Sequence, residues 1–254
     1  MSRKRNKPYS NARVMDLAEA LINNGRAIEE GPRRKQWTKH DLKHIQPLTL
    51  AQKDMFHDFF AGKHICGYGS AGTGKTYIAL YLALNEMLKS QSIDRIIIVR
   101  SAVPTRDMGF MPGTLEEKEA LYERPYRDMC ADLLGRSSSY QDMKDAGVIQ
   151  FSTTSYVRGL TWDNAVVIVD EAQNLIWHEI NSIVTRLGDD ARLIIVGDIP
   201  QDDLVRRRET TSMERLINVA QVMSVFSVIR FTYHDIVRSK FVKDWIMTCE
   251  DVAS

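Results

Sequence analysis

Between a short apolar run and a segment of helical periodicity lies the octapeptide Gly69-Ser70-Ala71-Gly72-Thr73-Gly74-Lys75-Thr76, which fits the pattern G-x-x-x-x-G-K-[ST]. A glycine-rich turn between a strand and a helix lets backbone N–H groups converge on phosphate oxygens at the helix N-terminus, whose partial positive charge favours an anion. We therefore expect all eight residues to form a phosphate-binding loop for a nucleotide. In such a loop Lys75 bridges the β- and γ-phosphates, and the Thr76 hydroxyl is a ligand of Mg²⁺.

Two adjacent carboxylates follow a second apolar run, about ninety positions further along the chain. The run at 166–169 contains only valine and isoleucine, which is typical of a strand covered on both faces, and Asp170 and Glu171 come directly after it. We expect Asp170 to hold the Mg²⁺ shell and Glu171 to polarise the attacking water. The alternative is that the two acidic residues cap a helix. The second carboxylate favours hydrolysis over GTPase-type switching or the phosphorylation of a small molecule.

A third apolar run, at 193–196, leads into Gly197-Asp198-Ile199-Pro200-Gln201. Polar groups that leave this strand at the level of the γ-phosphate can sense whether that phosphate is present. We therefore expect Asp198 to line the nucleotide site and Gln201 to hold the water or a phosphate oxygen. A turn that uses glycine, aspartate and proline for backbone reasons is the alternative.

Gln52 and two arginines complete the candidate site. Gln52 lies 17 positions before Gly69, and its amide could bond the N6 and N7 edge of adenine; an exposed helix position is the alternative. Arg186 and Arg238 are candidates for stabilising charge at the γ-phosphate, either in cis or across a subunit interface. Each could equally be a surface or ion-paired arginine.

The order of elements along the chain predicts an α/β fold, with a parallel sheet covered by helices on both faces. Strands are expected at 65–68, 95–99, 148–152, 165–169, 192–196 and 224–231, and helices at 75–89, 125–134, 178–187, 212–222 and 235–249. A proline-containing stretch at 100–126 is expected to be a loop or short lid. Residues 1–47 are expected to be a basic N-terminal helical segment and linker, with helical spacing at 14–22, and residues 48–254 the main domain.

Composition and charge narrow the class of protein. The chain has 254 residues, of which 44% are apolar or aromatic, so it can bury a core. No apolar run approaches the roughly 20 residues of a membrane span, and no secretory leader is expected behind the basic N-terminus; we expect a cytoplasmic protein with no membrane partner. Residues 1–63 carry 13 Lys and Arg against 7 Asp and Glu, a charge of +6, which suits contacts with phosphate backbones or a solvated arm.

These residues together resemble the PhoH-like proteins, a family of P-loop ATPases of bacteria and their phages that is akin to the first motor domain of superfamily 1 helicases. The resemblance covers Leu48 to about Trp245. Its motifs are GSAGTGKT at 69–76, RSAV at 100–103, GFMPG at 109–113, EK at 117–118, RG at 158–159, VDEAQN at 169–174, TRLG at 185–188, GDIPQ at 197–201 and DIVR at 235–238. It implies a RecA-like P-loop fold, hydrolysis of ATP with Mg²⁺, association with RNA or single-stranded nucleic acid, and ring-shaped homo-oligomers such as a hexamer.

Two functions of different class remain open. One is a helicase-like ATPase that binds or remodels RNA or single-stranded nucleic acid, which the basic N-terminal segment and the helicase-type motifs favour. The other is an ATP-driven, ring-forming regulatory or assembly protein that acts on protein partners. The net charge of only +1 and the lack of an aromatic stacking signature for nucleic acid keep the second function open.

Overall fold

A six-stranded, fully parallel β-sheet with the order β3-β2-β4-β5-β1-β6 forms the centre of the protein. The computed structural model describes residues 37–101, 115–154, 161–198 and 212–253. The strands are β1 (His64–Gly69), β2 (Arg95–Arg100), β3 (Ile149–Thr153), β4 (Ala165–Asp170), β5 (Arg192–Asp198) and β6 (Phe226–Phe231). All carboxyl ends of a parallel sheet meet at one edge, which is where open α/β sheets bind their ligands.

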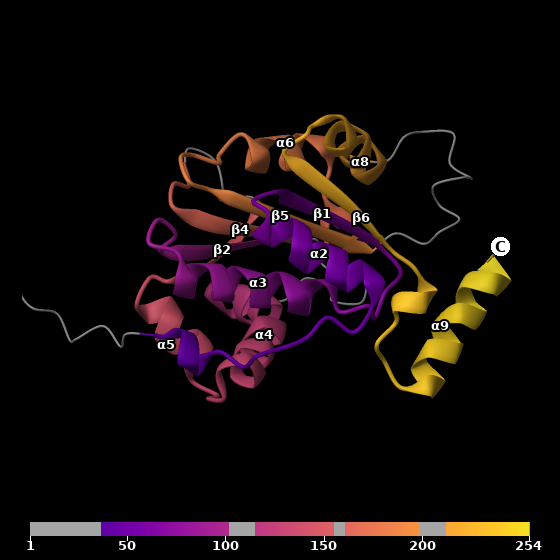
Figure 1. Cartoon of the computed structure of the whole chain (residues 1–254), viewed down its shortest axis with the longest axis horizontal. Helices are drawn as coiled ribbons and strands as arrows, with labels where there is room; N and C mark the ends of the chain where they lie inside the picture. The colour runs from indigo at the N-terminus through magenta and orange to yellow at the C-terminus, as the bar shows by residue number, and fades with distance from the viewer. Residues whose placement is uncertain (1–36, 102–114, 155–160, 199–211, 254) are drawn as a thin grey trace, which may run out of the picture. The chain divides into compact units, whose positions relative to one another are not determined.

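The central strands β2, β4 and β5 are rich in isoleucine and valine, and helices bury the sheet on both faces. In β4 every residue is buried, and Ile168 and Val169 face opposite sides of the sheet. Figure 1 shows α6 and α8 on one side of the sheet and α3 and α4 on the other. The bounds are α2 (Leu50–Phe60), α3 (Lys75–Lys89), α4 (Leu115–Leu134), α5 (Ser139–Asp145), α6 (Trp177–Val184), α8 (Ser212–Val222) and α9 (Lys240–Ala253).

The strand order separates the two strands that carry the motif residues. β1, which leads into the glycine-rich loop, and β4, which ends in Asp170, are both neighbours of β5. The end of β5 at Asp198 therefore lies between the loop and the paired carboxylates. A parallel sheet with this order, covered by helices on both faces, is the RecA-like P-loop fold that the sequence predicts.

All six predicted strands are present, and α3 and α8 have the predicted bounds. The expected loop at 100–126 is wrong over its last part, because α4 begins at Leu115 and includes Pro125. A proline inside a helix costs about 3 kcal/mol locally. Here the side chains of Tyr126, Cys130 and Leu133 are fully buried in the core, and this packing outweighs the local preference. Residues 102–114 of the expected loop lie outside the described residues.

Further helical segments differ from the prediction. α2 and α5 were not among the expected helices, and α6 ends at Val184 and not at 187. α9 begins at Lys240 rather than at 235, because Tyr233–Asp235 forms a separate 3₁₀ turn capped by Thr232. The helical spacing at 14–22 falls outside the described residues.

The segment at 37–47 packs on the same core as α3 and α4. Trp37, Leu42 and Ile45 lie against the core, and the Lys43 ammonium donates to the Asp132 carboxylate of α4 at 3.0 Å. The segment leads into α2, whose N-cap Thr49 accepts a hydrogen bond from the Gln52 backbone N–H. Within the described part of the chain, no helix combines the length and the apolar character that crossing a membrane requires.

Candidate functional site

The glycine-rich loop follows β1 and has the backbone shape that its glycines allow. Gly69 has a φ of +127°, and a Cβ atom there would collide with the backbone of Phe231 in β6. Gly74 has a φ of +81° and is the N-cap of α3. Both positions therefore need glycine, for the turn and for the close approach of two strands. The hydroxyl oxygen of Ser70 is buried and has no hydrogen-bond partner among the described residues.

Lys75 lies across the inside of this loop and is only 5% exposed. Its ammonium donates to the carbonyl oxygens of Gly69 at 3.2 Å and Ser70 at 2.7 Å, and to the hydroxyl of Thr73 at 3.1 Å. It also forms an ion pair with the Asp198 carboxylate at 2.9 Å. A buried cation of this kind, held where a phosphate would enter, can exchange these partners for phosphate oxygens.

The Asp170 carboxylate is held on both of its oxygens. The Thr76 hydroxyl donates to Oδ1 at 2.8 Å, and the Tyr126 hydroxyl donates to Oδ2 at 2.6 Å. Asp170 is 4% exposed. A hydroxyl and a carboxylate beside a phosphate-binding loop are the hard oxygen ligands that Mg²⁺ prefers, so the donor set fits that ion.

Glu171 directly follows the strand and has a left-handed backbone, with a φ of +53°. Burial, and secondly the charge of the adjacent Asp170, raise the pKa of the Glu171 carboxyl. Its Oε1 lies 3.6 Å from the guanidinium of Arg100, and its Oε2 accepts a hydrogen bond from the Gln173 amide at 2.6 Å. The same Gln173 side chain accepts a hydrogen bond from the Asp198 backbone at 2.9 Å.

These groups line one cavity of about 340 Å³. Its polar wall includes the loop at 72–76, Arg100, Asp170, Glu171 and Asp198. Pro125 and Met129 of α4 form the facing wall. With Arg238, the cavity therefore brings cationic, hydroxyl and carboxylate groups from five segments of the chain to the same place.

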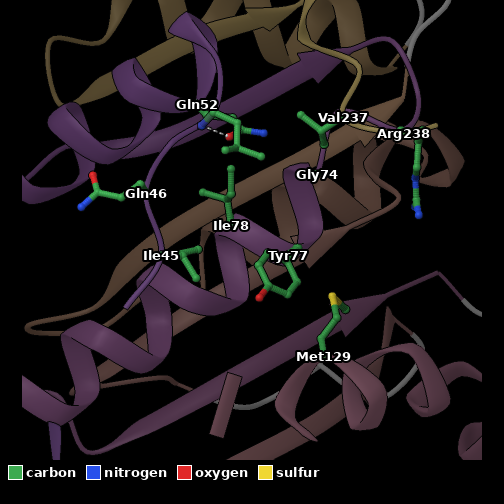
Figure 2. Close-up of a pocket in the computed structure, with 11 residues that line it drawn as sticks. Ile45, Gln46, Gln52, Gly74, Tyr77, Ile78, Met129, Val237 and Arg238 are labelled. Atoms are coloured by element: carbon green, nitrogen blue, oxygen red, sulfur yellow. Dashed lines mark hydrogen bonds between the residues drawn. The ribbon is translucent and has the colours of Figure 1, made fainter. Parts of the chain in front are cut away.

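A second cavity of about 590 Å³ adjoins the first, with five lining residues in common. It is mainly apolar, as expected for a site that holds a planar base. Figure 2 shows Tyr77 of α3 and Met129 of α4 on facing sides, with Gln52 and Ile78 above them. The Tyr77 hydroxyl donates to the Asp132 carboxylate at 2.5 Å, which ties α3 to α4 at the edge of this cavity.

Gln52 is buried in the wall of the second cavity, not exposed on a helix surface. Its carbonyl oxygen accepts the Leu48 N–H at 2.7 Å, and its amide donates to the Thr73 carbonyl at 2.9 Å. The side chain thus links the start of α2 to the phosphate-binding loop. An amide has two N–H groups and two lone pairs, so one of each remains beyond these two bonds.

The two candidate arginines lie in different places. Arg238 lines both cavities, and the Val237 N–H beside it donates to the Gly72 carbonyl at 3.1 Å. Arg186 lines neither cavity. Its carbonyl accepts the Trp162 N–H just before β4 begins, so it lies near the amino ends of the strands, away from the loop. Gln201 lies outside the described residues.

Sequence reasoning did not assign roles to several residues of the site. Arg100 is in register with Asp170 on the neighbouring strand. Its position at the end of a predicted strand is the signal that could have identified it as a site residue. Gln173 stands two positions after Glu171, within reach of the same turn. Tyr126 and Met129 come from α4, whose position against the sheet is not readable from local sequence.

Comparison with known proteins identifies the family to which the chain belongs. The family described as "PhoH-like protein" matches residues 44–250. A PhoH-like protein of Mycobacterium tuberculosis (strain H37Rv) is 33% identical over 203 residues, which are 80% of this chain and 57% of that protein. The protein PhoH of Escherichia coli (strain K12) is 37% identical over 204 residues, with 78% of this chain and 57% of that protein covered.

A PhoH-like protein of Bacillus subtilis (strain 168) is 39% identical over 163 residues, which are 64% of this chain and 50% of that protein. The chain thus spans about half the length of the curated relatives it matches. Among solved structures, the large terminase of a thermophilic bacteriophage aligns with a TM-score of 0.49 at 13% identity, over 79% of this chain and 50% of the terminase. Because the family match extends over most of the sequence, from 44 to 250, this chain belongs to the PhoH-like protein family.

Proposed function

We propose that the protein is a Mg²⁺-dependent ATPase, coupled to the binding or remodelling of RNA or single-stranded nucleic acid. The observation that carries the ATPase part is the convergence of Lys75, Thr76, Asp170 and Glu171 on one cavity that opens into a second, apolar one. The smaller cavity suits a triphosphate and the larger one suits adenosine. The buried Ser70 hydroxyl, which has no partner within the described part of the chain, supports the same interpretation.

Each group has a role that follows from its position. Lys75 binds the β- and γ-phosphates once they replace its present partners, among them Asp198. Thr76 and Asp170 would hold Mg²⁺, which would supply positive charge to neutralise the phosphates. Glu171 orients the attacking water and accepts its proton. Gln52 bonds the adenine edge with the donor and acceptor it has left.

Arg238 is the arginine that we place at the phosphates. It lines both cavities from the same chain, which supports action in cis. Arg186 is far from the loop of its own chain, so it could act only on the site of a neighbouring subunit. We include a ring-shaped homo-oligomer in the proposal. In a ring, Arg238 could act on its own site and Arg186 on the site of the neighbouring subunit.

Substitution of Lys75 tests the ATPase proposal. Lys75→Ala should abolish ADP binding measured by calorimetry and phosphate release from ATP, because the loop loses its cation. Lys53→Ala is the matched control, since Lys53 is exposed on α2 and lies in neither cavity. Undiminished ATP turnover by Lys75→Ala would contradict the assignment of the loop.

The coupling to nucleic acid is supported by the basic N-terminal segment, and it is tested separately. ATP turnover should rise when single-stranded RNA or single-stranded DNA is added, more than with duplex DNA. Binding to single strands should weaken with salt, each phosphate contact adding about 0.7 to the log–log slope. Deletion of residues 1–35 should reduce that slope.

The second candidate function, action on protein partners, is favoured by the surface of α9. Phe241 is 75% exposed and Trp245 is 62% exposed on this helix, and such large apolar side chains are typical of protein interfaces. If turnover is unchanged by every nucleic acid while Phe241→Ser abolishes self-association or activity, the second function replaces the first.

A further inference from the structure

The hydroxyl of Tyr126 is the part of the site that no motif explains. Tyr126 belongs to α4, its side chain is 1% exposed, and its hydroxyl lies 2.6 Å from Oδ2 of Asp170. The other carboxylate oxygen, Oδ1, accepts the hydroxyl of Thr76. Asp170 is therefore clamped between a residue of the phosphate-binding loop and a residue that comes from a different element.

The direction of this hydrogen bond is determined by chemistry. A phenol has an ordinary pKa of about 10, so it keeps its proton at neutral pH and can donate it in a hydrogen bond. An ionised carboxylate can only accept. Tyr126 is thus a permanent donor to Asp170, and a hydrogen bond to a charged acceptor is about twice as strong as one between neutral groups.

The phenol itself is held in place by the packing of its ring and of its helix. The ring of Tyr126 packs in the core, 5.9 Å between centroids from the ring of Phe151 in β3. Residue Pro125, directly before it, lines the phosphate cavity. The packing of α4 therefore opposes displacement of the hydroxyl from Asp170.

We propose that Tyr126 is a positioning residue for the Mg²⁺ site: it fixes the orientation of the Asp170 carboxylate so that Oδ1 faces Thr76 and the bound cation. This inference rests on the proposed ATPase function. Without the hydroxyl, the carboxylate rotates about its last bond, and the cation loses a pre-oriented ligand. Groups that hydrogen-bond a metal ligand in this way contribute about 10–100-fold to metal affinity or activity.

The test compares nucleotide binding with and without the metal. Calorimetry of the full-length chain with ADP, in Mg²⁺ and in EDTA, measures how much Mg²⁺ increases ADP affinity. In Tyr126→Phe this increase should shrink by about 10–100-fold, while the affinity in EDTA stays within about two-fold of wild type. In ATP turnover, the variant should need more Mg²⁺ to reach half of its maximal rate.

Tyr140→Phe is the matched control, because Tyr140 is equally buried, lies in α5 and lines neither cavity. It should behave as wild type in both buffers. An unchanged Mg²⁺ effect in Tyr126→Phe would overturn the inference, and so would an equal loss of affinity in Mg²⁺ and in EDTA, which marks a purely structural role. Failure of the wild-type protein to bind ADP would instead refute the proposed ATPase.

Discussion

Glu171 combines two unfavourable features in one residue. Its left-handed backbone, with a φ of +53°, costs a non-glycine residue about 1–3 kcal/mol. Burial is the main cause that raises the pKa of its carboxyl, and the nearby carboxylates of Asp170 and Asp198 raise this pKa further. Residues of this kind persist where the surrounding structure holds them, and they concentrate at functional sites. The arrangement aims the carboxylate into the phosphate cavity.

Glu171→Gln should separate binding from hydrolysis. Glutamine keeps the size of the side chain and can still accept the Gln173 amide hydrogen, but it cannot accept a proton from water. Turnover of ATP should fall by about 10²–10⁴-fold, the usual contribution of a positioned base, while ATP binding is kept. Phosphate-release kinetics measure the loss of turnover, and calorimetry measures whether ATP binding is kept. A rate within a few-fold of wild type would mean that another residue positions the water.

The same substitution should stabilise the protein without nucleotide at neutral pH. Because the pKa of Glu171 is raised in the folded state, folding takes up protons between the unfolded and folded pKa values, and stability falls as pH rises through that range. Glutamine carries no charge, so Glu171→Gln should melt a few degrees higher than wild type at pH 7. The difference should vanish below about pH 4, where the carboxyl is protonated in both states. Thermal melting of the variant and of the wild type, at pH 7 and below about pH 4, measures this difference.

At the scale of elements, the larger cavity depends on how the 37–47 segment and three helices are joined. Lys43 of the 37–47 segment and Tyr77 of α3 both hydrogen-bond Asp132 of α4. Gln52 joins the start of α2 to the loop before α3. The walls of the cavity are thus set by polar contacts between elements and not by one continuous segment. This makes the proposed base-binding site sensitive to changes outside the phosphate-binding motif.

Gln52→Ala should weaken ATP binding more than GTP binding. The change leaves the Leu48 N–H and the Thr73 carbonyl without their partner, at about 1–3 kcal/mol for each buried group, and removes the adenine contact that we propose. Competition binding with ATP and GTP measures the ratio. Gln141→Ala, on the exposed surface of α5, is the control. Equal losses for both nucleotides would show that Gln52 only supports the loop.

At the scale of the whole molecule, the main question is which chain supplies the arginine at the phosphates. The backbone beside Arg238 is bonded to Gly72, and a methyl group in place of the Gly72 hydrogen would lie only 3.1 Å from Cγ of Arg238. Ile246 of α9 approaches the same glycine. The C-terminal part of the chain therefore packs directly on its own phosphate-binding loop.

Mixing of two inactive variants distinguishes the two arrangements. Arg238→Ala should lower ATP turnover strongly, since an arginine at the phosphates contributes about 10³–10⁵-fold where it has been measured. If Arg238 acts in cis, mixing this variant with Lys75→Ala subunits leaves the activity low. Recovery of activity in the mixture, together with a ring by light scattering, would show action across an interface. A rate close to wild type for Arg238→Ala would exclude Arg238 from either role.

The sequence was a good guide where the signal is local. Strands β2, β4 and β5 are short runs rich in isoleucine and valine, and the phosphate-binding loop is defined by its glycines, so each is recognisable from a few neighbouring residues. Gly69 illustrates the reason. A residue with a Cβ atom could neither adopt its backbone conformation without strain nor leave room for β6 to pass so close. The positions of Asp170, Glu171 and Asp198 at strand ends follow from the same local patterns.

Other features depended on the packing of distant segments. Pro125 predicts a loop locally, yet the buried side chains that follow it make α4 a helix, and that helix brings Tyr126 to Asp170. Gln52 reads as an exposed helix residue until α2 is placed against the loop. Arg186 and Arg238 are both candidates in the sequence. Only the direction of the chain through the sheet shows that Arg238 lies beside the loop and Arg186 near the amino ends of the strands. A contact between residues far apart in the chain is set by how whole elements pack, and no short stretch of sequence contains that information.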